Sequence, residues 1–306
     1  MKKKLILILA ILVASSTIIA RKYKMVTGFN GGTYYKIGQS MASLPGLNLT
    51  VKNSKGSLQN IKMVRKGYAD FGITQLDIFE NLSYFDSSLK DAVKILFLLH
   101  KEEVHVLARK EYKSFKDLKG KKVAFGNRNS GTFSTSQILV ISMQMNENQF
   151  KLDYSSPLDS LKKLANGSLD AMIVVSGAPV DLLTNISSSD ADKMHFLSFN
   201  NKTMQFLTEG YLPYKKASLT SSLYPNLVDS FVSTVSTRSA VIVKANMPNA
   251  AVRNMILSVF KNRAKLVSIH PKWKEIKVKY TRAYYRRNKK SFHKNIVRSF
   301  RALRKK

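Results

Sequence analysis

Three short stretches place glycine beside serine or threonine where a β-like run passes into a helical pattern. They are residues 26–42, 53–57 and 126–132. Serine and threonine cap helices by accepting hydrogen bonds from backbone N–H groups, and glycine allows close approach of a ligand. A helix start also offers unpaired N–H donors and a partial positive charge, which suit an anion. Each junction alone is better explained as a capped turn, but together they predict one crevice that holds a small anionic group.

These junctions do not match a phosphate-binding fingerprint. The pattern GxxxxGK[ST] is absent, and GFNGGT at residues 28–33 is not GxGxxG. Tyr34 and Tyr35 point to different sides of a first helical turn, so one ring can face the crevice while the other packs inward. We expect Tyr34 to face the ligand; the alternative is that both rings only pack.

Asp77 follows a β-like run over residues 69–74, with Gln75 two residues before it. A carboxylate beside anion-binding helix starts would complete a site for a zwitterion. The ammonium group would then bind Asp77, and the carboxylate would bind backbone N–H groups. The alternative is that Asp77 caps a helix over residues 78–82.

Catalytic motifs are missing from the sequence. The chain has no cysteine, and its five histidines form no HExxH or HxxxH pair. No GxSxG elbow presents a serine nucleophile. Glu102 and Glu103 are adjacent and point to opposite faces of a strand, so they cannot act as a carboxylate pair. We interpret His105 as a core residue, and we expect no catalytic residue, metal or cofactor.

Short β-like runs alternate with helical patterns along most of the chain, which predicts parallel sheets with helices on both faces. The expected strands cover residues 24–28, 49–53, 69–74, 92–99, 104–109, 122–125, 169–175 and 233–244. The expected helices cover residues 33–43, 57–66, 132–145 and 250–265, and a further helix is opened by a proline at residues 179–183. Two sheets fit the length, with the chain crossing between lobes near residues 107–110 and 212–218.

The two ends of the chain are basic. Residues 1–20 have a lysine-rich start and a short apolar run, the pattern of a signal peptide, with an uncleaved anchor as the alternative.

The formal net charge is +32, and residues 277–306 carry thirteen Lys or Arg and no Asp or Glu. Apolar residues in that segment repeat at spacings of four, four and three, which predicts a basic amphipathic helix. They are Phe292, Ile296, Phe300 and Leu303.

Several motifs, in this order, resemble the TAXI family of solute-binding proteins, the extracytoplasmic receptors of TRAP transporters. The resemblance rests on TGFNGGTYYKIG (27–38), NSKGSLQNIKMVRKGYADFGITQLD (53–77), DLKGKKVAFGNRNSGTFSTSQILV (117–140), LKKLANGSLDAMIVVSGAPVDLL (161–183) and IHP (269–271). It implies an α/β, two-lobed, type II periplasmic-binding-protein fold, with a mostly parallel sheet flanked by helices in each lobe and hinge strands between them. We expect residues 21–108 and 215–276 to form lobe 1, residues 109–214 to form lobe 2, and residues 277–306 to form an extension.

The resemblance also implies a periplasmic or other extracytoplasmic receptor that works with a TRAP-type membrane permease. Its ligand would be a small carboxylate-bearing solute, such as glutamate, glutamine or a dicarboxylate. Carried over by position, the ligand-binding residues would be Gly32, Thr33, Tyr34, Lys55, Gly56, Ser57, Gln75, Asp77, Ser130, Gly131, Thr132, Gly177 and Pro179.

We expect the protein to be a monomer. This chain departs from the TAXI family pattern in two places. Lys55 stands where the family usually has Thr or Ser, and the basic segment from residue 277 lies outside the pattern. The alternative function is that of a basic cell-surface protein whose C-terminal segment, residues 277–306, contacts an anionic membrane surface or a polyanion.

Overall fold

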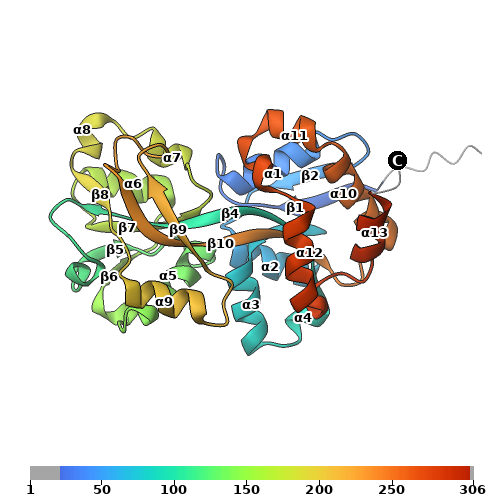
Figure 1. Cartoon of the computed structure of the whole chain (residues 1–306), viewed down its shortest axis with the longest axis horizontal. Coiled ribbons are helices and arrows are strands. Elements are labelled where there is room, and N and C mark those ends of the chain that lie inside the picture. The colour runs from blue at the N-terminus through green and yellow to red at the C-terminus, as the bar shows by residue number, and fades with distance from the viewer. Residues whose placement is uncertain (1–20, 304–306) are drawn as a thin grey trace, which may run out of the picture.

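Two long antiparallel strands join two lobes, β4 (Val93–Arg109) and β10 (Phe231–Lys244) (Figure 1). The computed structural model describes residues 21–303, so the signal-peptide prediction for residues 1–20 lies outside the described residues. Within the described range, no helix has the length and apolar character needed to cross a membrane.

The first lobe contains three parallel strands, which continue into β10 and β4. They are β1 (Tyr23–Val26), β2 (Leu49–Lys52) and β3 (Phe71–Gln75). The helices of this lobe are α1 (Thr33–Ala42), α2 (Ser57–Lys66), α3 (Leu76–Phe85), α4 (Leu89–Ala92), α10 (Asn249–Lys261), α11 (Arg263–Ile269), α12 (Val278–Arg287) and α13 (Ile296–Ala302).

The second lobe is built on the other halves of the same two long strands. Its strands are β5 (Lys122–Ala124), β6 (Lys151–Asp153), β7 (Ala171–Ser176), β8 (Met194–Phe196) and β9 (Lys215–Thr220). Its helices are α5 (Gly131–Ser142), α6 (Pro157–Ala165), α7 (Asp181–Thr184), α8 (Ser188–Ala191) and α9 (Asn201–Glu209). The α/β, two-lobed architecture is confirmed, but the strands form one continuous mixed sheet in the order β2-β1-β3-β10-β4-β7-β5-β6, with β8 on β4 and β9 on β10, and not two separate, mostly parallel sheets.

Two local predictions are wrong. The runs expected as separate strands at residues 92–99 and 104–109 form the single strand β4, because the polar residues between them lie in the hinge, where Glu102 and Glu103 are buried. Pro179 does not open a helix: its peptide bond with Ala178 is cis, and α7 starts only at Asp181.

The chain returns to the first lobe later than expected. β10 pairs with β9 through Ser236 and with β3 from Ser239, so the crossing lies between these two residues. Residues expected in the first lobe, among them Leu219 and Tyr224, pack in a core of the second lobe. The antiparallel pairing of β9 with β10 holds this segment there, and periodicity along the chain does not reveal such pairing.

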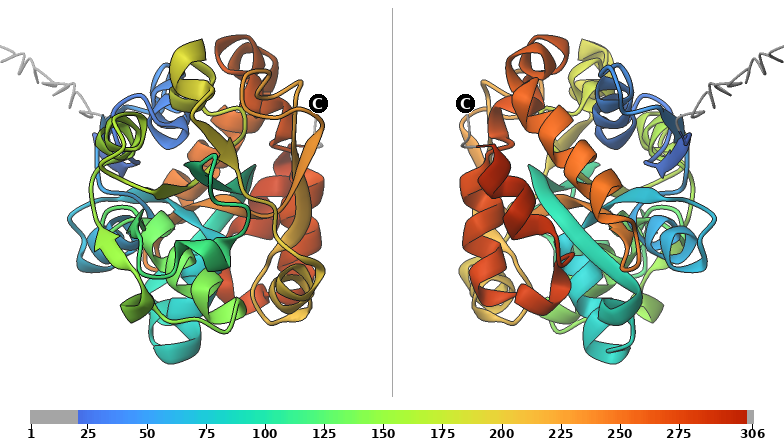
Figure 2. Two further views of the ribbon diagram at one scale, coloured as in Figure 1. Left: turned by 90° about the vertical axis from the view of Figure 1, so that its left-hand side faces the viewer. Right: turned by 90° about the vertical axis from the view of Figure 1, so that its right-hand side faces the viewer.

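The basic C-terminal segment is not a separate extension within the described residues. Phe292, Ile296 and Phe300 are buried in the core of the first lobe, and the His293 N–H donates to the Ile95 carbonyl of β4 at 3.1 Å. Figure 2 shows α10 and the C-terminal helices around the first half of β4 (right view). The predicted amphipathic helix is shorter than expected, because α13 covers only Ile296–Ala302 and Phe292 has extended backbone before it, and its apolar residues pack in the protein's own core.

Candidate functional site

Four helices begin at one cavity between the lobes: α1 and α2 from the first lobe, and α5 and α6 from the second. The cavity has a volume of about 220 Å³. The lining residues at these helix starts are Gly32, Thr33, Tyr34, Lys55, Gly56, Ser57, Ser130, Gly131, Thr132, Ser155, Ser156 and Pro157. Each helix start adds partial positive charge and N–H groups, so the cavity is suited to an anion.

The helices differ in how their first turns are capped. In the second lobe, the Ser130 and Ser156 hydroxyls accept from the N–H groups of Phe133 and Asp159. In the first lobe, α1 and α2 follow Gly32 and Gly56, which have no capping side chain. Glycine at these positions therefore leaves backbone donors of α1 and α2 without a side-chain acceptor.

The two lobes touch around this cavity. The Gln59 N–H of α2 donates to the Asn129 carbonyl of the second lobe at 3.1 Å. Gln75 Nε2 donates to Thr135 Oγ1 at 3.1 Å, and the hydroxyls of Thr33 and Ser176 lie 3.4 Å apart. The structure is thus a closed arrangement in which the lobes contact each other and both contribute residues to one site.

Two charged residues line the cavity, Glu102 and Lys55. The Tyr34 hydroxyl donates to Glu102 Oε2 at 2.6 Å. Burial raises the pKa of Glu102 well above its usual value, and the nearby carboxylates of Asp77 and Glu103 raise it further. The site therefore combines helix starts whose charge suits an anion with a buried carboxyl group.

Sequence reasoning considered Glu102 only as half of a catalytic pair, and so missed its place in the cavity. Glu103 has a different environment, because its carboxylate accepts a hydrogen bond from the Ala178 N–H at 2.9 Å. As expected, Tyr34 lines the cavity, whereas Tyr35 does not. The α6 start was also missed, although Ser156 followed by Pro157 is a recognisable helix-start signal.

Asp77 does not line the cavity. It is fully buried and accepts hydrogen bonds from the Tyr214 hydroxyl at 2.6 Å, the Thr135 hydroxyl at 2.9 Å and Gln75 Nε2 at 3.3 Å. Burial raises its pKa. It is not the N-cap of α3 either, a position held by Gln75. Asp77 therefore joins the lobes, since Tyr214 and Thr135 belong to the second lobe.

Gly177 and Pro179 also lie away from the cavity. Pro179 lines an adjacent hollow of about 530 Å³, where Lys36 of α1 forms an ion pair with Asp181. Gly177 packs against His100, and an added Cβ would lie 2.8 Å from its ring. The remaining carried-over residues, Gln75 included, line the cavity.

Two lobes joined by hinge strands, with a cavity between them at the helix N-termini, define the architecture of the periplasmic binding proteins. One solved structure with similarity to this chain is the arginine-, lysine-, histidine-binding protein ArtJ from Geobacillus stearothermophilus. The two sequences are 14% identical, the match covers 83% of this chain and 95% of ArtJ, and the TM-score is 0.50. A Bordetella bronchiseptica protein has 14% identity, coverage of 88% and 81%, and a TM-score of 0.51. A periplasmic sulfonate-binding protein, SsuA, of Methylobacillus flagellatus has 14% identity, coverage of 90% and 74%, and a TM-score of 0.46.

The chain belongs to the NMT1-like family, whose sequence profile matches residues 25–289. This match includes all of α12 (Val278–Arg287), so the NMT1-like pattern covers the first part of the basic segment at residues 277–306.

Proposed function

We propose that this chain is the extracytoplasmic solute receptor of a TRAP-type transporter. Its lobes close around a small carboxylate-bearing solute, and the closed form delivers the solute to a membrane permease. The convergence of four helix N-termini on one interlobe cavity carries this proposal. The resemblance to the TAXI family supports the TRAP assignment, and the match to the NMT1-like family is compatible with it.

The charges in the cavity favour an amino acid such as glutamate or glutamine. Backbone donors at the starts of α1 and α2, together with Lys55, suit a carboxylate. Glu102, ionised on binding and held by the Tyr34 hydroxyl, suits an ammonium group. Glu102 thus takes the role first assigned to Asp77. A dicarboxylate is the alternative, and with it Glu102 stays protonated and donates a hydrogen bond.

A ligand screen tests the proposal. The mature protein is unfolded and refolded to remove any bound solute, and its melting temperature is then measured with amino acids and dicarboxylates. A true ligand at a hundredfold excess over its Kd stabilises the protein by about 2.7 kcal/mol. The absence of any shift across the panel would refute the receptor function.

The Glu102→Gln variant separates the two ligand classes. It removes the negative charge that an ammonium group requires, so amino acid binding falls while dicarboxylate binding persists. Asp229→Asn, at an exposed carboxylate outside the cavity, is the matched control and leaves both unchanged. Undiminished amino acid binding by Glu102→Gln would contradict the role of Glu102.

A further inference from the structure

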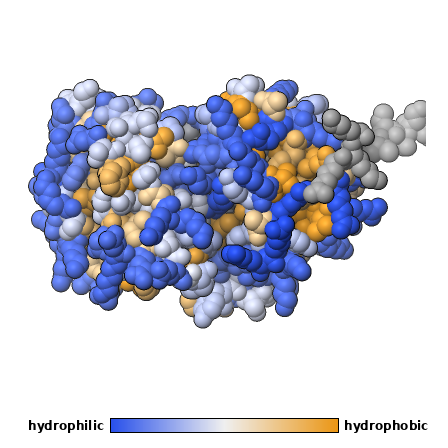
Figure 3. Space-filling model, viewed as in Figure 1, coloured by the Kyte–Doolittle hydropathy of each residue, from blue (hydrophilic) through white to orange (hydrophobic). Residues whose placement is uncertain are grey.

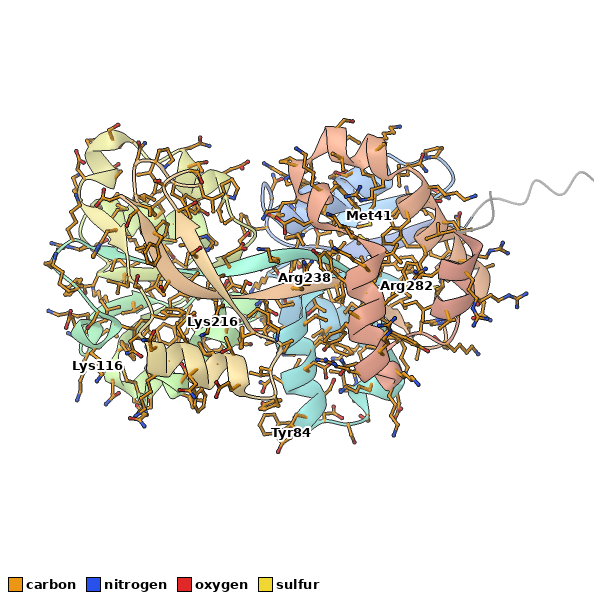
Figure 4. The ribbon with its side chains drawn as sticks, in the orientation of Figure 1. Met41, Tyr84, Lys116, Lys216, Arg238 and Arg282 are labelled. Carbon is orange, nitrogen blue, oxygen red and sulfur yellow. The ribbon has the colours of Figure 1, made fainter. Side chains whose placement is uncertain are left out.

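A second concave site lies at the hinge on the opposite side from the solute cavity. This hinge-side basic groove has a volume of about 540 Å³ and is bounded by the hinge strands, by α12 of the first lobe, and by the start of β9 in the second lobe. Its basic lining residues are Lys101, Lys215, Arg238, Arg286 and Arg287, and no Asp or Glu is among the lining residues. In Figure 4, Arg238 lies over the middle of the hinge, between Lys216 on β9 and Arg282 on α12.

The groove and the solute cavity are separate because strand residues alternate between the two faces of a sheet. Lys101 and Glu102 are successive residues of β4: Lys101 lines the groove, and Glu102 lines the cavity. A ligand in the groove would therefore not compete for the solute site.

The groove holds positive charge that carboxylates of the protein offset only in part, through Glu103 and Glu275. The Arg238 guanidinium donates to the Leu99 carbonyl at 2.7 Å and lies 4.0 Å from the centroid of the Tyr280 ring, so it is fixed in place by neutral groups. Among the described residues, no carboxylate forms an ion pair with Arg238, Lys215, Arg286 or Arg287, whereas Lys101 lies 3.8 Å from Glu103. An anion from outside would relieve the repulsion among these cations.

Basic side chains continue past one end of the groove, where Lys279 and Arg282 lie on α12 beside the groove residues Arg286 and Arg287. Figure 3 shows strongly hydrophilic residues across the middle of this face, with hydrophobic patches toward α10 and α13 and over the second lobe. The positive surface is therefore longer than the groove, which favours a polymer over a single small anion.

The chemistry of the groove favours phosphate and disfavours insertion into a bilayer. Three of its five cations are arginines, whose planar fork matches phosphate in a bidentate arrangement. The apolar stripe of the C-terminal segment, which includes Ile296 and Phe300, is used in the protein core. We propose that the hinge-side basic groove binds a linear polymer of phosphate groups.

Binding of fluorescent inorganic polyphosphate, measured by anisotropy over a range of salt concentrations, tests this proposal without any knowledge of the solute. In the groove variant, Lys215, Arg286 and Arg287 are all replaced by Gln. Affinity should fall about tenfold or more, and the slope of log K against log salt should decrease by about 2, since about 0.7 counterion is released per contact on a single strand.

The control variant replaces three exposed lysines by Gln: Lys116, which lies far from the hinge in Figure 4, its chain neighbour Lys119, and Lys202, which lines the same surface hollow as Lys116. It removes the same charge and should change affinity less than about threefold. Equal losses in both variants would mean that only net charge matters, and would overturn the groove assignment.

Two further probes identify the source of the phosphate. An oligothymidylate that binds in the same groove-dependent way supports the shared phosphate-polymer chemistry. Binding to phosphatidylglycerol vesicles with no binding to either polymer would overturn the proposal in favour of a membrane surface. Circular dichroism and thermal unfolding confirm that each variant is folded before it is measured.

Discussion

Gly131 is the position where one added carbon should interfere most directly with lobe closure. It is the first residue of α5 in the second lobe, and it faces the first lobe without a side chain. In Gly131→Ala, the new Cβ would lie 1.6 Å from Gln75 Oε1 and 2.7 Å from Ser57 Oγ. Because Gln75 and Ser57 belong to the first lobe, the clash exists only when the lobes are closed.

The expected cost follows from the contacts of Gln75. Its Oε1 must withdraw by at least 1.4 Å to reach the 3.0 Å below which Cβ contacts essentially never occur. That movement breaks the hydrogen bond from Gln75 Nε2 to Thr135 Oγ1 and the one from Ser57 Oγ to Gln75 Oε1. The closed state should lose about 1–3 kcal/mol, and solute affinity should fall by a factor of roughly 5–150.

Calorimetric titration with the solute found in the ligand screen measures the affinity. Lobe separation can be followed independently, because the chain has no cysteine and accepts spin labels at Lys62→Cys and Lys162→Cys, exposed positions in the two lobes. The label distance should shift toward longer values in Gly131→Ala. In a Gln75→Ala background the added Cβ should cost less. Wild-type affinity and wild-type label distances in Gly131→Ala would refute this view of closure.

Two further predictions concern buried groups. Burial raises the pKa of Glu102 well above that of a Glu in the unfolded chain, about 4.3, so the folded state keeps a proton that the unfolded state has released. The contribution of this group to stability is full below about pH 4.3 and declines as the pH rises toward the folded pKa. The free energy of unfolding of Glu102→Gln, measured by urea denaturation, should therefore increase relative to that of the wild type as the pH rises from about 5 to 8. Parallel pH profiles of the two proteins would contradict this. Ile296→Ala should lower the free energy of unfolding by about 2–5 kcal/mol, because Ile296 is 2% exposed in the core. The control Ile269→Ala, at a 47% exposed position, should lower it far less. Equally small effects of the two substitutions would indicate that the C-terminal segment is a separate extension.

The sequence alone was most informative about features that local chemistry decides. The helix at residues 57–66 was predicted with its observed bounds, because Gly56 and Ser57 start it and Gly67 ends it within a few residues of chain. Helical periodicity likewise predicted that Tyr34 and Tyr35 point to different sides of α1, but it did not decide which of the two rings lines the cavity. All four helix starts at the cavity carry such local signals, and three of them were recognised from the sequence, whereas Ser156 and Pro157 at the start of α6 were not.

The tertiary structure decided which partner each polar or apolar surface meets. Asp77 follows a strand near the site, yet Tyr214, more than a hundred residues away in the chain, takes its carboxylate. Glu102 reaches the cavity because β4 continues across the hinge, while the sequence there suggested a break between two strands. Phe292, Ile296 and Phe300 illustrate the physical reason. An apolar stripe in the sequence indicates that a segment buries one side, but only the fold determines whether that side contacts a membrane or the protein's own core.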